Sequence, residues 1–294
     1  MSLKYALAAL TCLTLAPMSA MAQTAPDENE EVVVRAEGVD EAIRSFVGAV
    51  TVEAGGTDQL ATWGGRLCIG VMGLRGPQAQ AVIDRVATRA DALEVTLGEP
   101  GCPPNLLIIF ATDSDRVARV LVDEYRRVLG YFSTDGATRG RSAMEDFAST
   151  PRPVRWWHVS NAADDTGAVA VNRTIGGPPT VNTSAGGSRI ENPTHQTFTR
   201  AFIVVDSARV AGVRIDALAD YISMAALAQL DPDADTSGYP TILNAFRDGE
   251  ATNAELTLTD WDQSYLTGLY SSPTNRDAGF QRRGIQRQMR EGGN

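Results

Sequence analysis

The sequence has very little of the side chains on which most enzyme mechanisms depend. Lysine occurs once, at Lys4, and histidine occurs only at His158 and His195. A Schiff-base lysine, a P-loop and a Ser–Lys dyad are excluded after Lys4, because each of them needs a lysine. A zinc site with three histidines from one chain is excluded too. We assign no catalytic residue and expect no cofactor.

The first 22 residues have the pattern of a secretory signal peptide. Lys4 supplies a short positive region, residues 5–18 form an uncharged apolar run, and Ala20-Met21-Ala22 gives a small-x-small cleavage site. The run is shorter than the ~20 residues of a membrane-spanning helix, and no later segment is apolar for long enough to span. We therefore expect a periplasmic or secreted mature protein that begins near Gln23.

Cysteine is scarce as well, with three in the chain. Removal of the signal peptide takes Cys12 with it and leaves Cys68 and Cys102, and an even pair in an exported protein is normally a disulfide. The two cysteines are 34 residues apart, and closing that loop contributes about 3 to 4 kcal/mol. No Cys-x-x-Cys occurs, which disfavours a redox role. We predict a structural Cys68–Cys102 disulfide.

Positive charge is also in deficit, and the formal net charge is −10. An acidic exported chain is unsuited to electrostatic binding of nucleic acid or of an anionic membrane surface. The expected partner is an unidentified protein of the cell envelope or the extracellular space.

What the sequence does contain is an alternation of strand and helix patterns after an acidic lead-in. The lead-in, 23–40, is predicted to be flexible, with a short edge strand at Glu31–Arg35. The N-terminal part, 41–150, is predicted as an α/β unit, in which Asp113 or Asp115 caps a helix. Its strands are expected at 66–74, 92–97 and 105–110, and its helices at 77–93 and 116–129.

The C-terminal part, 151–294, is predicted to combine strands and helices around a long polar loop at 161–195. Its last residues form a basic tail, which we interpret as a solvated helix face on an acidic body. The fold class is α+β. Strands are expected at 152–160, 168–171 and 196–206, and helices at 215–230, 259–270 and in the tail.

Two histidines and an acidic turn are the polar features that suggest a site. His158 follows two tryptophans on a strand and is interpreted as half-buried, and His195 is interpreted as a surface residue. Asp231, Asp233 and Asp235 alternate like the first three ligands of a calcium loop, which makes them a weak calcium candidate.

The calcium pattern ends after these three residues. Thr236 stands where a calcium loop requires glycine, and Ile242 stands where a bidentate glutamate belongs. An acidic turn that ends the preceding helix is the simpler interpretation.

Residues 196–272 resemble the C-terminal half of zincin-like proteins. After an apolar strand and a helix come a loop with Ser237 and Thr241-Ile242-Leu243, and then a helix with the pattern L-T-x-x-D-x-x-x-L-x-x-L-Y. The segment is similar to an uncharacterised family of secreted bacterial proteins distantly related to metzincins. The residues of this pattern are Leu258, Thr259, Asp262, Leu266, Leu269 and Tyr270. The aspartate of the family pattern could equally correspond to Asp260.

The resemblance implies a zincin-like fold, but the zinc motif is missing. Metzincins carry His-Glu-x-x-His on this helix, so that two imidazoles one turn apart share a zinc ion and the glutamate handles the water. The degenerate zinc-site positions here are Ile222, Ser223 and Ala226, which offer no ligand set. Asp216 and Asp220 lie near the amino end of the helix, where a capping role is expected.

The sequence therefore predicts an exported protein with a binding or structural role and no zinc chemistry. One alternative is a hydrolase that uses carboxylates at a site not evident from the sequence. Another is an extracellular module that calcium supports.

Overall fold

The computed structural model describes residues 28–131, 137–172, 179–181, 191–246 and 257–292, with side chains from Gly38 onwards. The chain divides into two units, Met1–Glu37 and Gly38–Asn294. The predicted signal peptide lies outside the described residues. Helix α1 spans Glu28–Val50, so the edge strand predicted at Glu31–Arg35 is wrong. The buried positions Ile43, Phe46, Val47 and Val50 are spaced for a helix, and helix propagation is cooperative enough to include the β-branched run.

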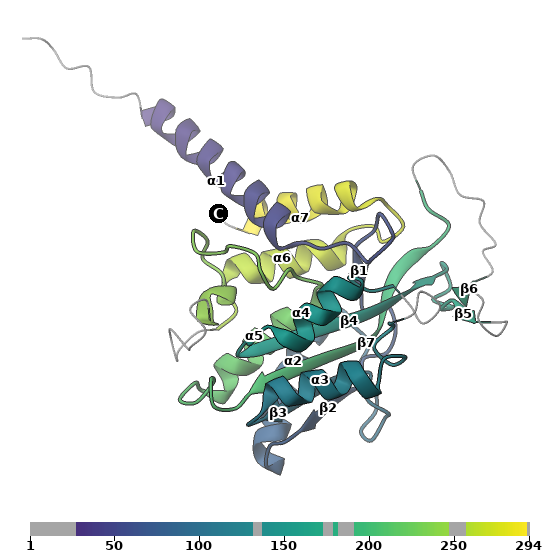
Figure 1. Cartoon of the computed structure of the whole chain (residues 1–294). Coiled ribbons are helices and arrows are strands. Elements are labelled where there is room, and N and C mark those ends of the chain that lie inside the picture. Colours follow the sequence, from purple (N-terminus) through teal and green to yellow (C-terminus); the bar gives the residue numbers. More distant parts are fainter. Residues whose placement is uncertain (1–27, 132–136, 173–178, 182–190, 247–256, 293–294) are drawn as a thin grey trace, which may run out of the picture. The chain divides into compact units, whose positions relative to one another are not determined.

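A mixed, mainly parallel sheet forms the centre of the second unit, Gly38–Asn294 (Figure 1). The central strand β7 runs parallel to β3 on one side and antiparallel to β4 on the other, and β2 extends the sheet beyond β3. The short strand β1 pairs with the start of β7. The strands are β1 Ala61–Thr62, β2 Ile69–Met72, β3 Leu106–Ala111, β4 Val154–Ala163 and β7 His195–Asp206. A separate hairpin pairs β5 Val171–Asn172 with β6 Pro179–Thr180.

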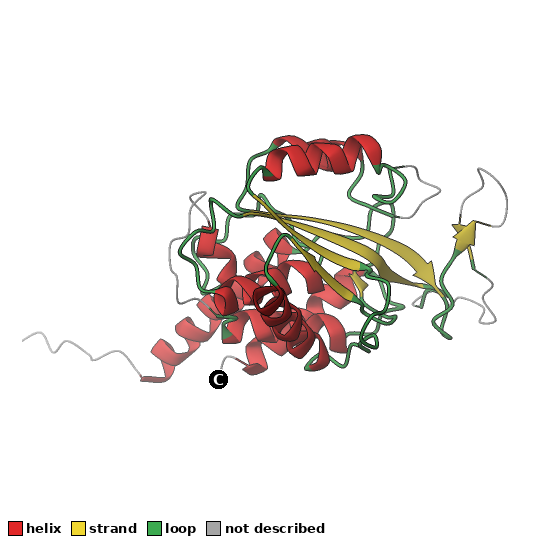
Figure 2. Ribbon diagram, turned by 90° about the horizontal axis from the view of Figure 1, so that it is seen from below, coloured by secondary structure: helices red, strands yellow, loops and turns green. Residues whose placement is uncertain are grey.

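Helices cover both faces of this sheet (Figure 2). On one face, a large core cluster joins β3 and β7 to helices α2 and α5, and it continues into α6 and α7. On the other face, a smaller cluster joins β4 and β7 to α3 and α4. The helices are α2 Gly76–Asp91, α3 Ser114–Glu124, α4 Arg141–Ser149, α5 Ile215–Leu227, α6 Asp260–Ser271 and α7 Ala278–Gly292, with a 3₁₀ turn η1 at Ile242–Phe246.

Strands from both predicted parts of the chain meet in one sheet, because β2 and β3 precede residue 151 whereas β4 and β7 follow it. Strand β7 is buried at every residue from Ala201 to Asp206, as expected for a strand with neighbours on both edges and helices on both faces. The prediction of an α+β fold is confirmed in its coarse form, since strands and helices combine in one mixed α/β fold with a largely parallel sheet.

Two local predictions in the N-terminal part need correction. The strand predicted at 92–97 is a turn that ends α2, in which Glu94 adopts a positive φ of 62° and the Val95 N–H donates to the Ala90 carbonyl. That turn leaves only Leu97 to bridge to Leu67. Helix α4 was not predicted, since it is short and Gly140 at its N-cap offers no capping side chain.

The Cys68–Cys102 disulfide is present in the structure. It ties the start of β2 to the segment that leads into β3, with 6.1 Å between the two Cα atoms. Gly98 packs so closely here that a Cβ atom on it would lie 2.4 Å from the Cys102 sulfur. The bond therefore fixes the loop between α2 and β3 against the sheet.

Truncation of Ile108 tests how central β3 is. Its side chain is fully buried in the large core cluster, so Ile108→Ala should lower the free energy of unfolding by about 2 to 5 kcal/mol. Ile109→Ala is the matched control, because Ile109 is only partly buried and should cost less. Urea denaturation measures both. Equal midpoints for Ile108→Ala and the wild type would mean that β3 is not central.

Candidate functional site

Helix α5 carries the positions at which the sequence lacks zinc ligands, and all of them are packed. Ile222, Ser223 and Ala226 have no exposed surface. The Ser223 hydroxyl donates to the Ala219 carbonyl at 2.7 Å, within the same helix. The helix is buried at every residue from Ala217 to Leu227. Hydrocarbon from neighbouring elements therefore fills the space around these positions.

Three side chains from other parts of the chain close the carboxyl end of α5. The Ala226 carbonyl accepts hydrogen bonds from Trp63 Nε1 at 2.9 Å and from His158 Nε2 at 3.3 Å. The Tyr270 hydroxyl donates to the Leu227 carbonyl at 2.8 Å. Helix-terminal carbonyls have no partner within the helix, so these donors replace the next turn and fix where α5 ends.

His158 on β4 is more deeply buried than predicted. It is 4% exposed, and its ring centroid lies 4.6 Å from that of Phe198. Burial lowers the pKa of His158 to about 4, and the nearby charge of Arg139 acts in the same direction. The imidazole is therefore neutral at neutral pH and serves as a packed donor to α5.

The depressed pKa of His158 predicts acid destabilisation. In the unfolded chain His158 has a pKa of 6.5 and is protonated below that pH. In the folded protein it stays neutral until the pH approaches 4. Stability is thus lost as the pH falls through this window. His158→Gln keeps an amide donor and removes the titration, so its unfolding midpoint should fall less between pH 7 and pH 5. Identical pH dependence of the two proteins would contradict this assignment.

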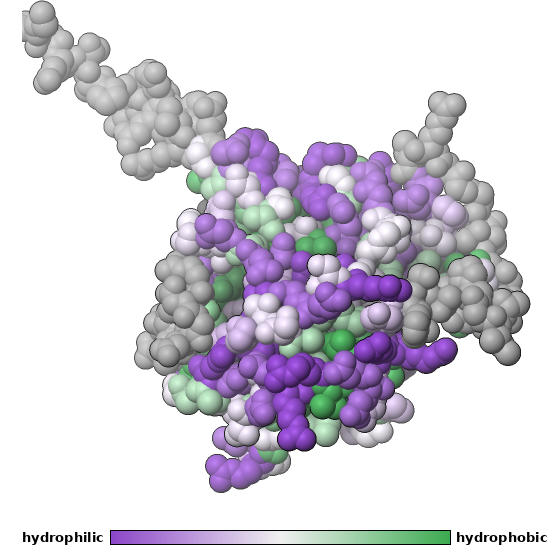
Figure 3. Space-filling model, viewed as in Figure 1, coloured by the Kyte–Doolittle hydropathy of each residue, from purple (hydrophilic) through white to green (hydrophobic). Residues whose placement is uncertain are grey.

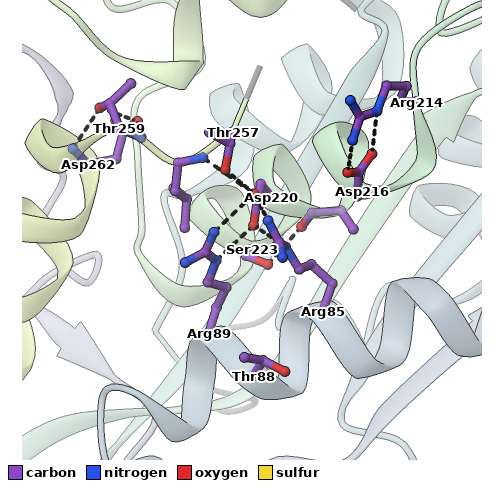
Figure 4. A network of polar contacts seen from close by, with 12 residues as sticks. Arg85, Thr88, Arg89, Arg214, Asp216, Asp220, Ser223, Thr257, Thr259 and Asp262 are labelled. Carbon is purple, nitrogen blue, oxygen red and sulfur yellow. Dashed lines mark hydrogen bonds and ion pairs between the residues drawn. The ribbon is translucent and has the colours of Figure 1, made fainter. Parts of the chain in front are cut away.

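Asp220, on the second turn of α5, is the centre of a buried ionic network (Figure 4). Its carboxylate accepts paired hydrogen bonds from Arg85 at 2.8 and 2.6 Å and from Arg89 at 2.8 and 3.0 Å, both on α2. The Thr257 hydroxyl adds a fifth at 2.7 Å. Burial alone would raise the pKa of Asp220, but these donors lower it below its usual value.

The expectation that both aspartates cap α5 is therefore wrong for Asp220, which joins α5 to α2. Asp216, one turn earlier, pairs with Arg214 at the exposed amino end of the helix. The two aspartates have opposite surroundings. Asp220 has no exposed side-chain surface, whereas the Asp216 side chain is 44% exposed.

The three aspartates of the acidic turn bind separate partners rather than a shared centre. Asp231 pairs with Arg139 at 2.9 Å, and Asp233 pairs with Arg152 at 2.9 Å. Asp235 accepts a hydrogen bond from the Ser237 backbone at 3.0 Å. Across the described part of the chain, no group of three or more His, Cys, Asp or Glu side chains is arranged to hold a metal ion.

Thr259 and Asp262, at the start of α6, have a structural role. Thr259 and Asp262 form a capping box. The Asp262 carboxylate also accepts from Thr241 Oγ1 at 2.5 Å and from the Ile242 N–H at 2.8 Å. It therefore joins α6 to the loop before η1, whereas Asp260 is exposed.

His195 and the basic tail belong to other parts of the fold. His195 begins β7 and lies near Asp164, and burial lowers its pKa. Its side chain is half-buried rather than on the surface. In α7, Arg282 pairs with Glu53 at 2.8 Å and Arg290 with Asp40 at 3.8 Å. These pairs agree with the interpretation of the tail as a basic helix on an acidic body.

The arginine partners of the aspartates are what sequence reasoning missed. Arg85 and Arg89 lie more than 130 residues from Asp220, and no local pattern connects such distant positions. The one available signal was their spacing on α2, which places two guanidinium groups on one helix face.

None of the helices in the described ranges combines the length and the apolar character needed to cross a membrane. Comparisons with known proteins add no family. No family model, no curated protein and no solved structure matches this chain.

Proposed function

We propose that the protein is an exported binding protein of the cell envelope, built on a zincin-like frame that lacks zinc chemistry. The observation that carries the proposal is the packing of α5. Ile222 and Ala226 take the places of two metal ligands, and both are completely buried. Zinc needs nitrogen, sulfur or carboxylate donors, and these positions offer hydrocarbon.

The residues that carry the resemblance to zincin-like proteins make contacts that hold the C-terminal helices together, and these contacts support a zincin-like frame. Leu266 and Leu269 pack in the large core, Asp262 fixes the loop before η1, and Tyr270 binds the end of α5. A pattern whose residues hold one helix against the end of another can persist without catalysis. We therefore propose the zincin-like frame without zinc-dependent peptidase activity.

The buried carboxylates give no support to a hydrolase. The four buried aspartates of the described residues are Asp164, Asp206, Asp220 and Asp262. Hydrogen bonds lower the pKa of the first three, although burial acts in the opposite direction. A general acid at neutral pH needs a raised pKa. Burial raises the pKa of Asp262, but its oxygens are engaged by Thr241, Ile242 and Thr259.

The surface favours a polar ligand over an extended apolar partner. The face in Figure 3 is mostly hydrophilic, with small separate hydrophobic areas. Among the described residues, the exposed large hydrophobic side chains lie on four separate segments, at Val39, Met72, Tyr125 with Val128, and Val171. Apolar docking sites are normally contiguous. A pocket is therefore a better candidate for binding than an apolar face.

A peptide-hydrolysis assay tests the proposal. The purified mature protein is incubated with unfolded casein and with a mixed peptide library, with and without a chelator. We expect no turnover under either condition. Turnover that the chelator removes would overturn the proposal in favour of a metallopeptidase. Turnover that survives the chelator and disappears in a carboxylate variant would overturn it in favour of the hydrolase.

A further inference from the structure

A pocket lies at the carboxyl end of β4, beside the segment that carries Arg139, the partner of Asp231 in the acidic turn. Its volume is about 540 Å³, within the range of small-molecule sites. Its wall joins the turn at 55–56, residues 130–131, the segment 137–141, and the ends of β4 and β7. Gly55 allows this closure, because a Cβ atom there would lie 1.5 Å from the Thr138 carbonyl oxygen.

The charged side chains that the described residues contribute to this wall are positive. Among the described residues that line the pocket, Arg139 and Arg141 are the charged ones and no acid is present. Arg139 donates to Asp231 from one terminal nitrogen, which leaves the rest of its guanidinium group available. Arg141 stacks on the Tyr131 ring at 5.0 Å and has no carboxylate partner among the described residues. The described wall therefore places two guanidinium groups at one pocket of a chain with a net charge of −10, and one of the two is also paired with Asp231.

The amide of Gln196 adds a hydrogen-bond donor to the pocket wall, on a side chain that the strand β7 holds in place. Gln196 is 5% exposed and lines the pocket. Its Oε1 accepts from the Ser160 hydroxyl at 3.3 Å, and its Nε2 has no partner among the described residues. Asn161 beside it accepts from Thr199 at 3.0 Å, and its amide nitrogen is likewise without a partner in the described chain.

The amino end of helix α4 contributes to the same wall. Arg141 is its first residue, Gly140 is its N-cap, and no side chain caps it. The free N–H groups of a helix amino end favour a negative charge. Two guanidinium groups, two amide groups and a helix amino end thus place several hydrogen-bond donors around one pocket.

We infer that this pocket binds a small organic molecule through an oxyanion, a carboxylate or a phosphate group, held by Arg139, Arg141 and Gln196. Guanidinium groups bind these anions through paired, charge-assisted hydrogen bonds. The volume exceeds what an oxyanion alone would fill, so the remainder of the molecule lies against Tyr131 and the glycine-rich wall. The inference goes beyond the proposed function and does not depend on the zincin-like frame.

Isothermal titration calorimetry of the whole mature protein tests this inference. The probes are inorganic phosphate, phenyl phosphate and succinate, each at millimolar concentration, and they separate a free inorganic ion from an organic phosphate and an organic carboxylate. We expect saturable binding of phenyl phosphate or succinate, more tightly than of inorganic phosphate. Arg141→Gln should weaken that binding by about ten-fold or more.

Two further variants make the result specific. Arg119→Gln removes an equal charge from an exposed position on α3 and should leave the affinity unchanged. Gln196→Glu places a negative charge in the pocket and should abolish binding, with circular dichroism to check the fold. Absence of saturable binding for all three probes would overturn the inference. Tighter binding of inorganic phosphate, or equal weakening by Arg141→Gln and Arg119→Gln, would also overturn it.

Discussion

Replacement of Asp220 by asparagine should lower the free energy of unfolding by about 3 to 5 kcal/mol, because it removes one partner of a buried ionic network. The variant keeps the shape of the side chain but loses the charge that Arg85 and Arg89 share. The effect should lie towards the lower end of this range, since the side chains of both arginines are partly exposed, 36% and 21%, and can turn towards water.

Asp216→Asn provides the matched control for that experiment. Asp216 lies one turn earlier on α5 and pairs with Arg214 at the surface (Figure 4). Exposed ion pairs contribute about 0 to 1 kcal/mol, so urea denaturation of this variant should resemble that of the wild type. If the two variants lose the same stability, the network around Asp220 does not join α5 to α2 as described.

The double substitution Ile222→His with Ala226→His should lower the free energy of unfolding by about 4 kcal/mol or more. It creates the one-turn spacing of zinc-binding histidines but places two imidazoles in a filled core. Overpacking costs about 1 to 3 kcal/mol, and each buried polar group without a partner costs about as much again. The two substitutions add neither a third zinc ligand nor the glutamate that activates the water, so we expect no hydrolytic activity.

A second pair of histidines, placed on an exposed helix face, tests whether the loss of stability comes from burial or from the histidine side chains themselves. Arg283→His with Arg287→His places them at equal spacing on α7, where both residues are exposed. This control should unfold within about 1 kcal/mol of the wild type. A buried pair that is as stable as the exposed pair and binds stoichiometric zinc would mean that α5 lines an open cleft.

The periodic elements were predictable because burial patterns repeat locally. Helix α2 shows this, since its buried residues Val82, Val86 and Ala90 recur every four positions. The failures have local causes as well. The residues at 92–97 have the composition of a strand, but the positive φ of Glu94 belongs to a turn that follows α2, and only Leu97 forms a bridge. Helix α4 lacks an N-capping side chain and so gave no start signal.

The candidate site was predictable only in what it lacks. The absence of ligands at Ile222 and Ala226 is visible in the sequence, whereas their complete burial is a property of the fold. The pocket of Arg139, Arg141 and Gln196 could not be foreseen, because a loop, a helix and the central strand β7 each contribute part of it. Tertiary contacts of this kind leave no periodic signal.

The metal content of the purified wild-type protein is the most direct test of the central claim, that α5 is a packing element and not a metal-binding helix. The protein is dialysed at neutral pH against buffer with a slight excess of zinc, then against metal-free buffer, and analysed for zinc per chain. The account predicts a ratio near zero, because Ile222 and Ala226 are buried hydrocarbon and offer no ligand. One zinc ion per chain, removed only by a chelator and with a loss of thermal stability, would contradict it.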